Sequence, residues 1–135
     1  MKLTKNTKRA KGMTLLELTV VILVLLSLIT ILFIGARAWK KGSDRAGCIM
    51  NIRNVQQAAR SYQNMYNLAI GDDVPAGKLQ GADQFLETAP VCPGGGTYSP
   101  ADLTAAVAIP AIGTPVLSCT LSATQDHVPS DTTGW

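Results

Sequence analysis

The sequence predicts an α+β fold: a long N-terminal helix, first transmembrane and then amphipathic, packed on a small head with an antiparallel β-sheet. Three observations lead to this prediction. A run of 19 uncharged residues begins at Leu18, a helical apolar stripe follows it, and the last third alternates short apolar segments with proline and glycine. With 135 residues, 47% hydrophobic and 16% charged, the chain has the size of one small domain and is too apolar to be disordered.

Residues 1–12 form a basic leader. They hold five of the twelve Lys and Arg residues and no acidic residue. The other seven basic residues are outnumbered by nine acidic ones, so residues 13–135 carry a net charge of −2. The basic character of the chain therefore belongs to the leader and not to a nucleic-acid-binding surface, and no nucleic acid is expected as a partner.

Residues 13–38 are predicted to cross a membrane. As a helix, the uncharged run Leu18–Ala36 spans about 28 Å, close to the hydrocarbon thickness of a bilayer. An isolated strand would leave its backbone unpaired in lipid, so the helix is favoured in spite of many β-branched residues. The Lys and Arg counts slightly favour a cytoplasmic N-terminus, which places the head outside the cytoplasm. The residues leave three fates open: an uncleaved anchor, a secretory signal cut after Ala38, or a cut before the apolar run.

One acidic residue, Glu17, lies at the start of this helix. A carboxylate in lipid is costly and needs a partner. If the chain is cut after Gly12, the new amine of Met13 lies four residues from Glu17 and can pair with it, within one helix or between neighbouring helices. Pairing between helices would fix the register of packed subunits, because any slip would leave both charges unpaired. The alternative is a carboxylate that only reaches back to the headgroup region.

Residues 8–34 resemble the N-terminal signature of type IV pilins and of the pseudopilins of type II secretion systems. The shared pattern is a basic leader ending in glycine, then a hydrophobic residue, Thr, two aliphatic residues, Glu and a long apolar helix, here KGMTLLEL at positions 11–18. The resemblance implies cleavage between Gly12 and Met13 by a prepilin peptidase, N-methylation of Met13, and a role for Glu17 in subunit docking.

The resemblance also implies a pilin-like fold and a structural function. The subunit would be stored in the bacterial inner membrane after leader cleavage, with its head outside the cytoplasm. An inner-membrane assembly platform would then build a periplasmic or cell-surface filament, homomeric or mixed. The chain departs from the family pattern at two positions: Met13 replaces the commoner Phe, and Ile34 stands where many pilins have a helix-breaking proline. We therefore expect a more continuous helix, still interrupted or bent near Gly35, Gly42 and Gly47. The alternative function is a monomeric, membrane-anchored extracytoplasmic binding module.

Residues 39–68 are predicted to continue the helix as an amphipathic segment that enters the head. Apolar residues recur every three or four positions, at Cys48, Ile52, Val55, Ala59, Tyr62 and Tyr66. The opposite face is polar, with Arg53, Gln57, Arg60, Asn64 and Asn67. We expect the apolar stripe to pack on the head.

Residues 69–135 are predicted to form this small β-rich head. A connecting region comes first, with a possible short helix over Leu79–Glu87. Asp72, Asp73 and Asp83 lack the spacing of a calcium-binding loop and are interpreted as solvated turn carboxylates. Three strand candidates follow, separated by proline and glycine: Thr97–Ser99, Leu103–Ile109 and Thr114–Leu121. Gly94–Gly96 are interpreted as a flexible turn that opens a hairpin.

The three cysteines allow one disulfide in an oxidising compartment. We favour Cys92–Cys119, since both belong to the β region; Cys48 could pair with either, or stay buried and free. The absence of a CxxC pair argues against a zinc site, and neither a metal nor a cofactor is expected. The only histidine, His127, has no assignable orienting group for nucleophilic catalysis and is interpreted as a surface or tail residue. No enzyme activity is expected.

Overall fold

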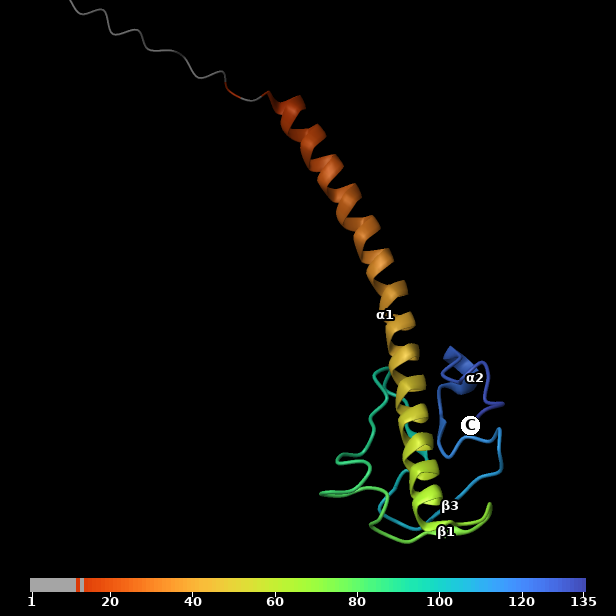
Figure 1. Ribbon diagram of the computed structural model, residues 1–135. Coiled ribbons are helices and arrows are strands. Elements are labelled where there is room, and N and C mark those ends of the chain that lie inside the picture. Colours follow the sequence, from red (N-terminus) through yellow and green to blue (C-terminus); the bar gives the residue numbers. More distant parts are fainter. Residues whose placement is uncertain (1–11, 13) are drawn as a thin grey trace, which may run out of the picture. The chain divides into compact units, whose positions relative to one another are not determined.

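The computed structural model describes Gly12 and residues 14–135 (Figure 1). These residues form an α+β structure with one long N-terminal helix, α1 (Leu15–Tyr66), a short helix, α2 (Ser122–Gln125), and four two-residue strands. The chain divides into two compact units, the first ending at Ala38 and the second comprising Trp39–Trp135. Each unit is described in turn.

In the first unit, α1 is apolar and fully exposed. Its large hydrophobic side chains between Leu15 and Ile34 are 47% to 82% exposed. By length and composition this stretch could cross a membrane. The helix is continuous through Ile34, which agrees with the absence of a proline at position 34. It is also uninterrupted at Gly35, Gly42 and Gly47, where an interruption or bend was expected.

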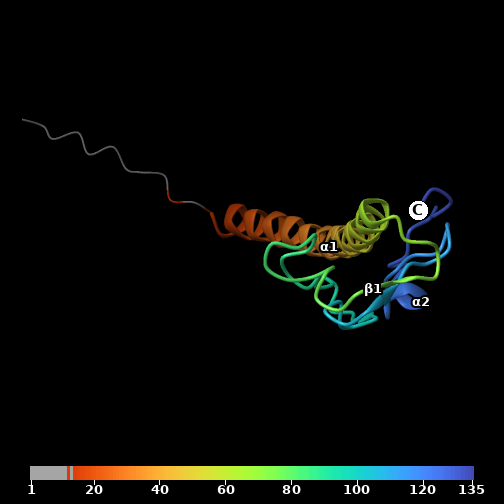
Figure 2. The same ribbon diagram turned by 60° about the horizontal axis from the view of Figure 1, so that its bottom comes forward.

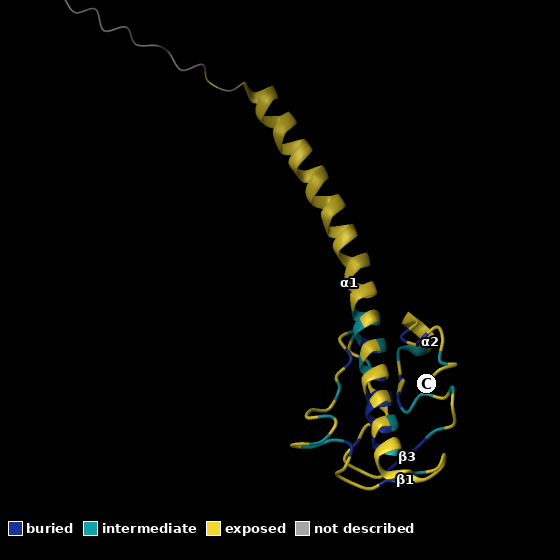
Figure 3. Ribbon diagram, in the orientation of Figure 1, coloured by how far each residue is buried: buried dark blue, intermediate teal, exposed yellow. Residues whose placement is uncertain are grey.

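In the second unit, the predicted apolar stripe of α1 is confirmed as the centre of the core. The turned view shows the strands and loops lying on one side of this part of α1 (Figure 2), and the buried and half-buried residues of α1 all lie in this part of the helix (Figure 3). Five of the six stripe residues are buried, whereas Tyr66, at the end of the helix, is 58% exposed. The helix ends there because Asn67 is left-handed (φ 52°) and Leu68 N–H donates to Gln63 C=O at 3.0 Å, which is a Schellman closure.

The strands form two small antiparallel sheets. β1 (Asp73–Val74) pairs with β3 (Val107–Ala108), and β2 (Tyr98–Ser99) pairs with β4 (Ser118–Cys119). The register places Val74 opposite Val107 and Tyr98 opposite Cys119. Each predicted strand segment therefore contains a real strand, but only two residues of it. β1 was not predicted.

The predicted helix over Leu79–Glu87 is wrong. The chain instead makes a tight loop in which Gly81 N–H donates to Leu86 C=O at 2.9 Å and Leu86 N–H donates to Leu79 C=O at 3.0 Å. Gly81 (φ 153°) and Asp83 (φ 61°) have backbone angles that no α-helix allows. Leu79, 1% exposed, nevertheless joins the core.

Buried polar contacts hold the last segment of the chain to α1. The side chain of Gln56, 3% exposed, accepts a hydrogen bond from Val116 N–H at 2.8 Å. Arg60 donates to the carbonyl oxygens of Pro110 and Trp135 at 3.0 and 3.2 Å. These bonds hold three points of the chain, Pro110, Val116 and Trp135, against α1.

Candidate functional site

The predicted processing site lies at the edge of the described residues. Gly12 is exposed, and apart from its two neighbours in the chain no described residue lies within 4 Å of the position that a Cβ atom would take there. Met13, the predicted site of N-methylation, lies outside the described residues. Cleavage between the two stays a prediction.

Glu17 forms a capping box with Thr14 at the start of α1. Thr14 Oγ1 accepts the N–H of Glu17 at 3.3 Å, and Glu17 Oε2 accepts the N–H of Thr14 at 3.4 Å. This reciprocal pair satisfies two backbone donors that an N-terminal helical turn leaves free. Glu17 therefore has a local structural role that the sequence argument did not consider, although its T-x-x-E spacing is the usual signal for a capping box.

Downstream of Glu17, polar side chains in the apolar stretch bond back to the helix itself. The hydroxyls of Thr19, Ser27 and Thr30 donate to backbone carbonyls three or four residues earlier, at 2.7 to 2.9 Å. These hydroxyls therefore need no water, and the surface of the stretch is compatible with an apolar environment.

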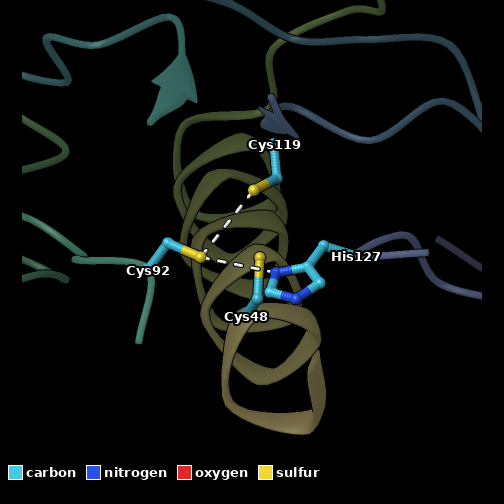
Figure 4. A group of neighbouring side chains, drawn as sticks. All are labelled: Cys48, Cys92, Cys119 and His127. Atoms are coloured by element: carbon cyan, nitrogen blue, oxygen red, sulfur yellow. Dashed lines mark hydrogen bonds between the residues drawn. The ribbon is translucent and has the colours of Figure 1, made fainter. Parts of the chain in front are cut away.

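In the second unit, all three cysteines and the histidine meet in one buried cluster (Figure 4). Cys48, Cys92, Cys119 and His127 are between 0% and 4% exposed, and their ligand atoms all lie within 4.8 Å of one another. The interpretation of His127 as a surface or tail residue is therefore wrong. The left-handed Asp126 (φ 57°) ends α2 and turns the chain inward, so that the imidazole is enclosed.

The predicted disulfide partners do lie side by side. The sulfurs of Cys92 and Cys119 are 3.8 Å apart, as free thiols, and Cys92 Sγ is 3.4 Å from Nδ1 of His127. A disulfide between Cys92 and Cys119 stays a prediction. The Cys92–His127 contact is too deeply buried to offer a nucleophile to a substrate.

Burial and hydrogen bonding shift the pKa values of the Cys48 and Cys92 thiols in different directions. Burial is the main cause that raises the pKa of Cys48 to about 12; the hydrogen bond with Tyr98 opposes this shift, and the neighbouring thiols of Cys119 and Cys92 add to it. For Cys92, burial alone would raise the pKa, but the N–H groups of Gly96 and Gly94 and the neighbouring thiols favour the thiolate and lower it. Burial, followed by the contact with Cys48, raises the pKa of Tyr98.

Glycines allow the segments of the cluster to approach one another. A Cβ atom on Gly94 would lie 2.7 Å from Cε1 of His127, and one on Gly96 would lie 2.9 Å from the sulfur of Cys119. Gly95 (φ 81°) closes the turn in a left-handed conformation, with its N–H donating to Cys92 C=O at 3.0 Å. The turn over 94–96 is thus a close-packed wall of the cluster, rather than a loose hairpin loop.

On the helix, Gly47 serves the same purpose. A Cβ atom at this position would lie 2.9 Å from Cγ of Pro93. The sequence analysis missed this role. The signal was a small residue next to a cysteine on each side of the contact: Gly47-Cys48 on the helix and Cys92-Pro93-Gly94 in the turn.

Comparisons of the chain with protein-family models, with curated proteins and with solved structures found no match. The functional conclusions therefore depend on the geometry described above.

Proposed function

We infer that this chain is a structural subunit of a type IV pilus-like filament, a pilin or pseudopilin. Residues 1–12 would be removed by a prepilin peptidase, and the subunit would be stored in the inner membrane until its N-terminal helix packs with those of other subunits. The observation that carries the proposal is the fully exposed apolar stretch of α1 that opens on the Thr14–Glu17 capping box.

An apolar surface of this kind needs a covering. Side chains that are 47% to 82% exposed along nearly six helical turns would be poorly soluble in water. Lipid covers such a stretch before assembly, and the same stretch of neighbouring subunits covers it afterwards. Both environments are apolar, and the self-bonded hydroxyls of Thr19, Ser27 and Thr30 suit either of them.

Glu17 can serve both its own helix and a neighbouring subunit. A carboxylate has room for about four hydrogen bonds, so the bond from Thr14 N–H does not exhaust it. After cleavage, the amine of Met13 would be a cation next to this carboxylate. In a filament core, a neighbour's amine at this position would neutralise Glu17 and set the axial register of the two helices.

Three variants separate the charge of Glu17 from its capping role. Glu17→Gln keeps the capping box and loses the charge, Thr14→Ala loses the capping hydroxyl and keeps the charge, and Glu17→Ala loses both. The assay compares the sheared surface fraction with the membrane fraction of a host that has a prepilin peptidase and an assembly platform. We expect both Glu17 variants to stay in the membrane and to fall by about tenfold or more in the sheared fraction, while Thr14→Ala assembles.

Two outcomes would contradict the proposal. If the wild-type chain is found only as monomers in the membrane, it is an anchored binding module. If Glu17→Gln assembles normally and Thr14→Ala does not, Glu17 only caps the helix.

Maturation is tested separately: the N-terminus should be a methylated Met13, and Gly12→Val should leave the leader attached. A mature chain that starts at Trp39, after a cut at Ala38, would refute the assigned cleavage.

A further inference from the structure

Four distant segments converge on the cysteine–histidine cluster. Cys48 comes from α1, Cys92 from the turn before β2, Cys119 from the end of β4, and His127 from the chain after α2. The chain contains three cysteines and one histidine, and all four are here. Figure 4 shows the three sulfurs and Nδ1 of His127 turned toward a common centre.

Two of the six separations between the ligand atoms match a tetrahedral zinc site, and the others lie within 4.8 Å. With Zn–S bonds of about 2.3 Å and a Zn–N bond of about 2.0 Å, tetrahedral geometry places two sulfurs about 3.8 Å apart and a sulfur and a nitrogen about 3.5 Å apart. The Cys92–Cys119 sulfur separation is 3.8 Å, and Cys92 Sγ to His127 Nδ1 is 3.4 Å. A disulfide needs sulfurs about 2.05 Å apart.

The cluster also contains polar atoms that the protein leaves without a partner. His127 is completely buried, and its Nε2 atom has no hydrogen-bond partner among the described residues. A buried polar group without a partner is costly. Of the two ring nitrogens, Nδ1 faces the sulfurs and is the one placed to bind a metal ion; such an ion would hold the ring in place without giving Nε2 a partner.

Groups around the cluster are suited to a metal–thiolate centre. The glycine turn packs directly against the cluster, since a Cβ atom on Gly94 would meet His127 and one on Gly96 would meet the sulfur of Cys119. Arg45 lies one helical turn before Cys48 and pairs with Asp126, next to His127, at 2.6 Å. Three thiolates, one neutral imidazole and Zn²⁺ carry a net charge of −1, and the Arg45–Asp126 ion pair beside the cluster is neutral as a whole.

The second unit has little regular structure to hold it together. Apart from α1 and the single turn of α2, its described residues contain only the two pairs of two-residue strands. Small domains with few strands are commonly stabilised by a metal or by disulfides. A metal bound to four segments would link α1, the glycine turn, β4 and the chain after α2 at a single point.

We propose that Cys48, Cys92, Cys119 and His127 form a structural zinc site that holds the Trp39–Trp135 unit together. All four positions are filled by protein, so the site is closed and has no open position for catalysis. Binding displaces the thiol protons, up to three per zinc ion. The spacing argument against zinc assumed a CxxC pair, but here the fold brings the ligands together from separate segments. The proposal does not depend on filament assembly.

The experiment uses the full chain, purified in a mild detergent with a histidine-free tag, and measures bound metals by mass spectrometry. We expect about one zinc per chain, and a lower melting temperature after chelation that added zinc restores. Replacement by cobalt(II) should give the visible bands of a tetrahedral thiolate site. His127→Ala should weaken zinc binding by more than about 100-fold, whereas His127→Cys should keep zinc and change the cobalt spectrum.

Alkylation and intact mass distinguish zinc from the disulfide, because both need the sulfurs of Cys92 and Cys119. With zinc, all three cysteines become alkylated once the protein is denatured with a chelator and no reductant. A disulfide would leave one alkylated cysteine and lower the mass by about 2 Da. That result, a different bound metal, or a folded wild-type chain that takes up neither zinc nor cobalt would overturn the proposal.

Discussion

Replacing Gly47 and Gly42 by alanine should change stability in opposite directions. Both glycines lie in α1, where alanine is favoured over glycine by about 1 kcal/mol. At Gly42 nothing lies within 4 Å of the new Cβ atom, so Gly42→Ala should gain up to this amount. At Gly47 the Cβ atom would be 2.9 Å from Cγ of Pro93, well inside the contact distance of about 3.5–4.0 Å.

The proline ring cannot rotate away, so the turn that carries Cys92 must move. Overpacking of this kind costs about 1–3 kcal/mol, and Gly47→Ala should therefore be less stable than Gly42→Ala by about this amount. For a unit of this size, each kcal/mol shifts the melting temperature by about 4–8 °C. Thermal unfolding of the full chain in detergent, followed by tryptophan fluorescence, measures the difference. Equal shifts for the two variants would refute the contact between Gly47 and Pro93.

Two further predictions concern the core and the response to acid. Gln56→Ala leaves the half-buried N–H of Val116 unpaired and should cost about 1–3 kcal/mol in chemical unfolding, whereas Gln57→Ala, on the exposed face, should change stability by less than about 0.5 kcal/mol. Hydrogen bonds from Thr104 lower the pKa of Asp102 below 3.8 in the folded protein. The ionised carboxylate therefore stabilises the fold above pH 3.8, and this stabilisation is lost as the pH falls through the pKa of the folded state. Melts from about pH 5 to about pH 2 should be less pH-dependent in Asp102→Asn than in the wild type; identical profiles would contradict the assignment.

The helical part of the structure follows from local sequence patterns. The apolar run that starts at Leu18 sets the exposed stretch, and the three- and four-residue spacing from Cys48 to Tyr62 sets the buried face. These signals are strong because each turn of the helix repeats them. The strands are weaker signals: β1 (Asp73–Val74) is too short to show any alternation. The helix predicted over Leu79–Glu87 is wrong because the prediction gave too little weight to Gly81, a residue that disfavours a helix.

The cluster could be predicted only in part. Cys92 and Cys119 were placed together because both lie in the β region. The positions of Cys48 and His127 depend on how α1 and the chain after α2 pack, and no local pattern encodes that packing. The glycines beside the cysteines were the available signal, since a close approach of two backbones requires small residues.

The contacts between α1 and β4 also affect when the second unit can fold. Gln56 is bound to a residue 60 positions later, and Cys48 contacts His127 across a still longer stretch of chain. Contacts of such high sequence separation form slowly, because a long loop must close before they can form. During N-to-C synthesis, the ribosome releases Cys48 and Cys92 well before His127. For the zinc site proposed above to form, both thiols have to stay reduced and unpaired until the last segment arrives, and during that interval they are exposed to oxidants.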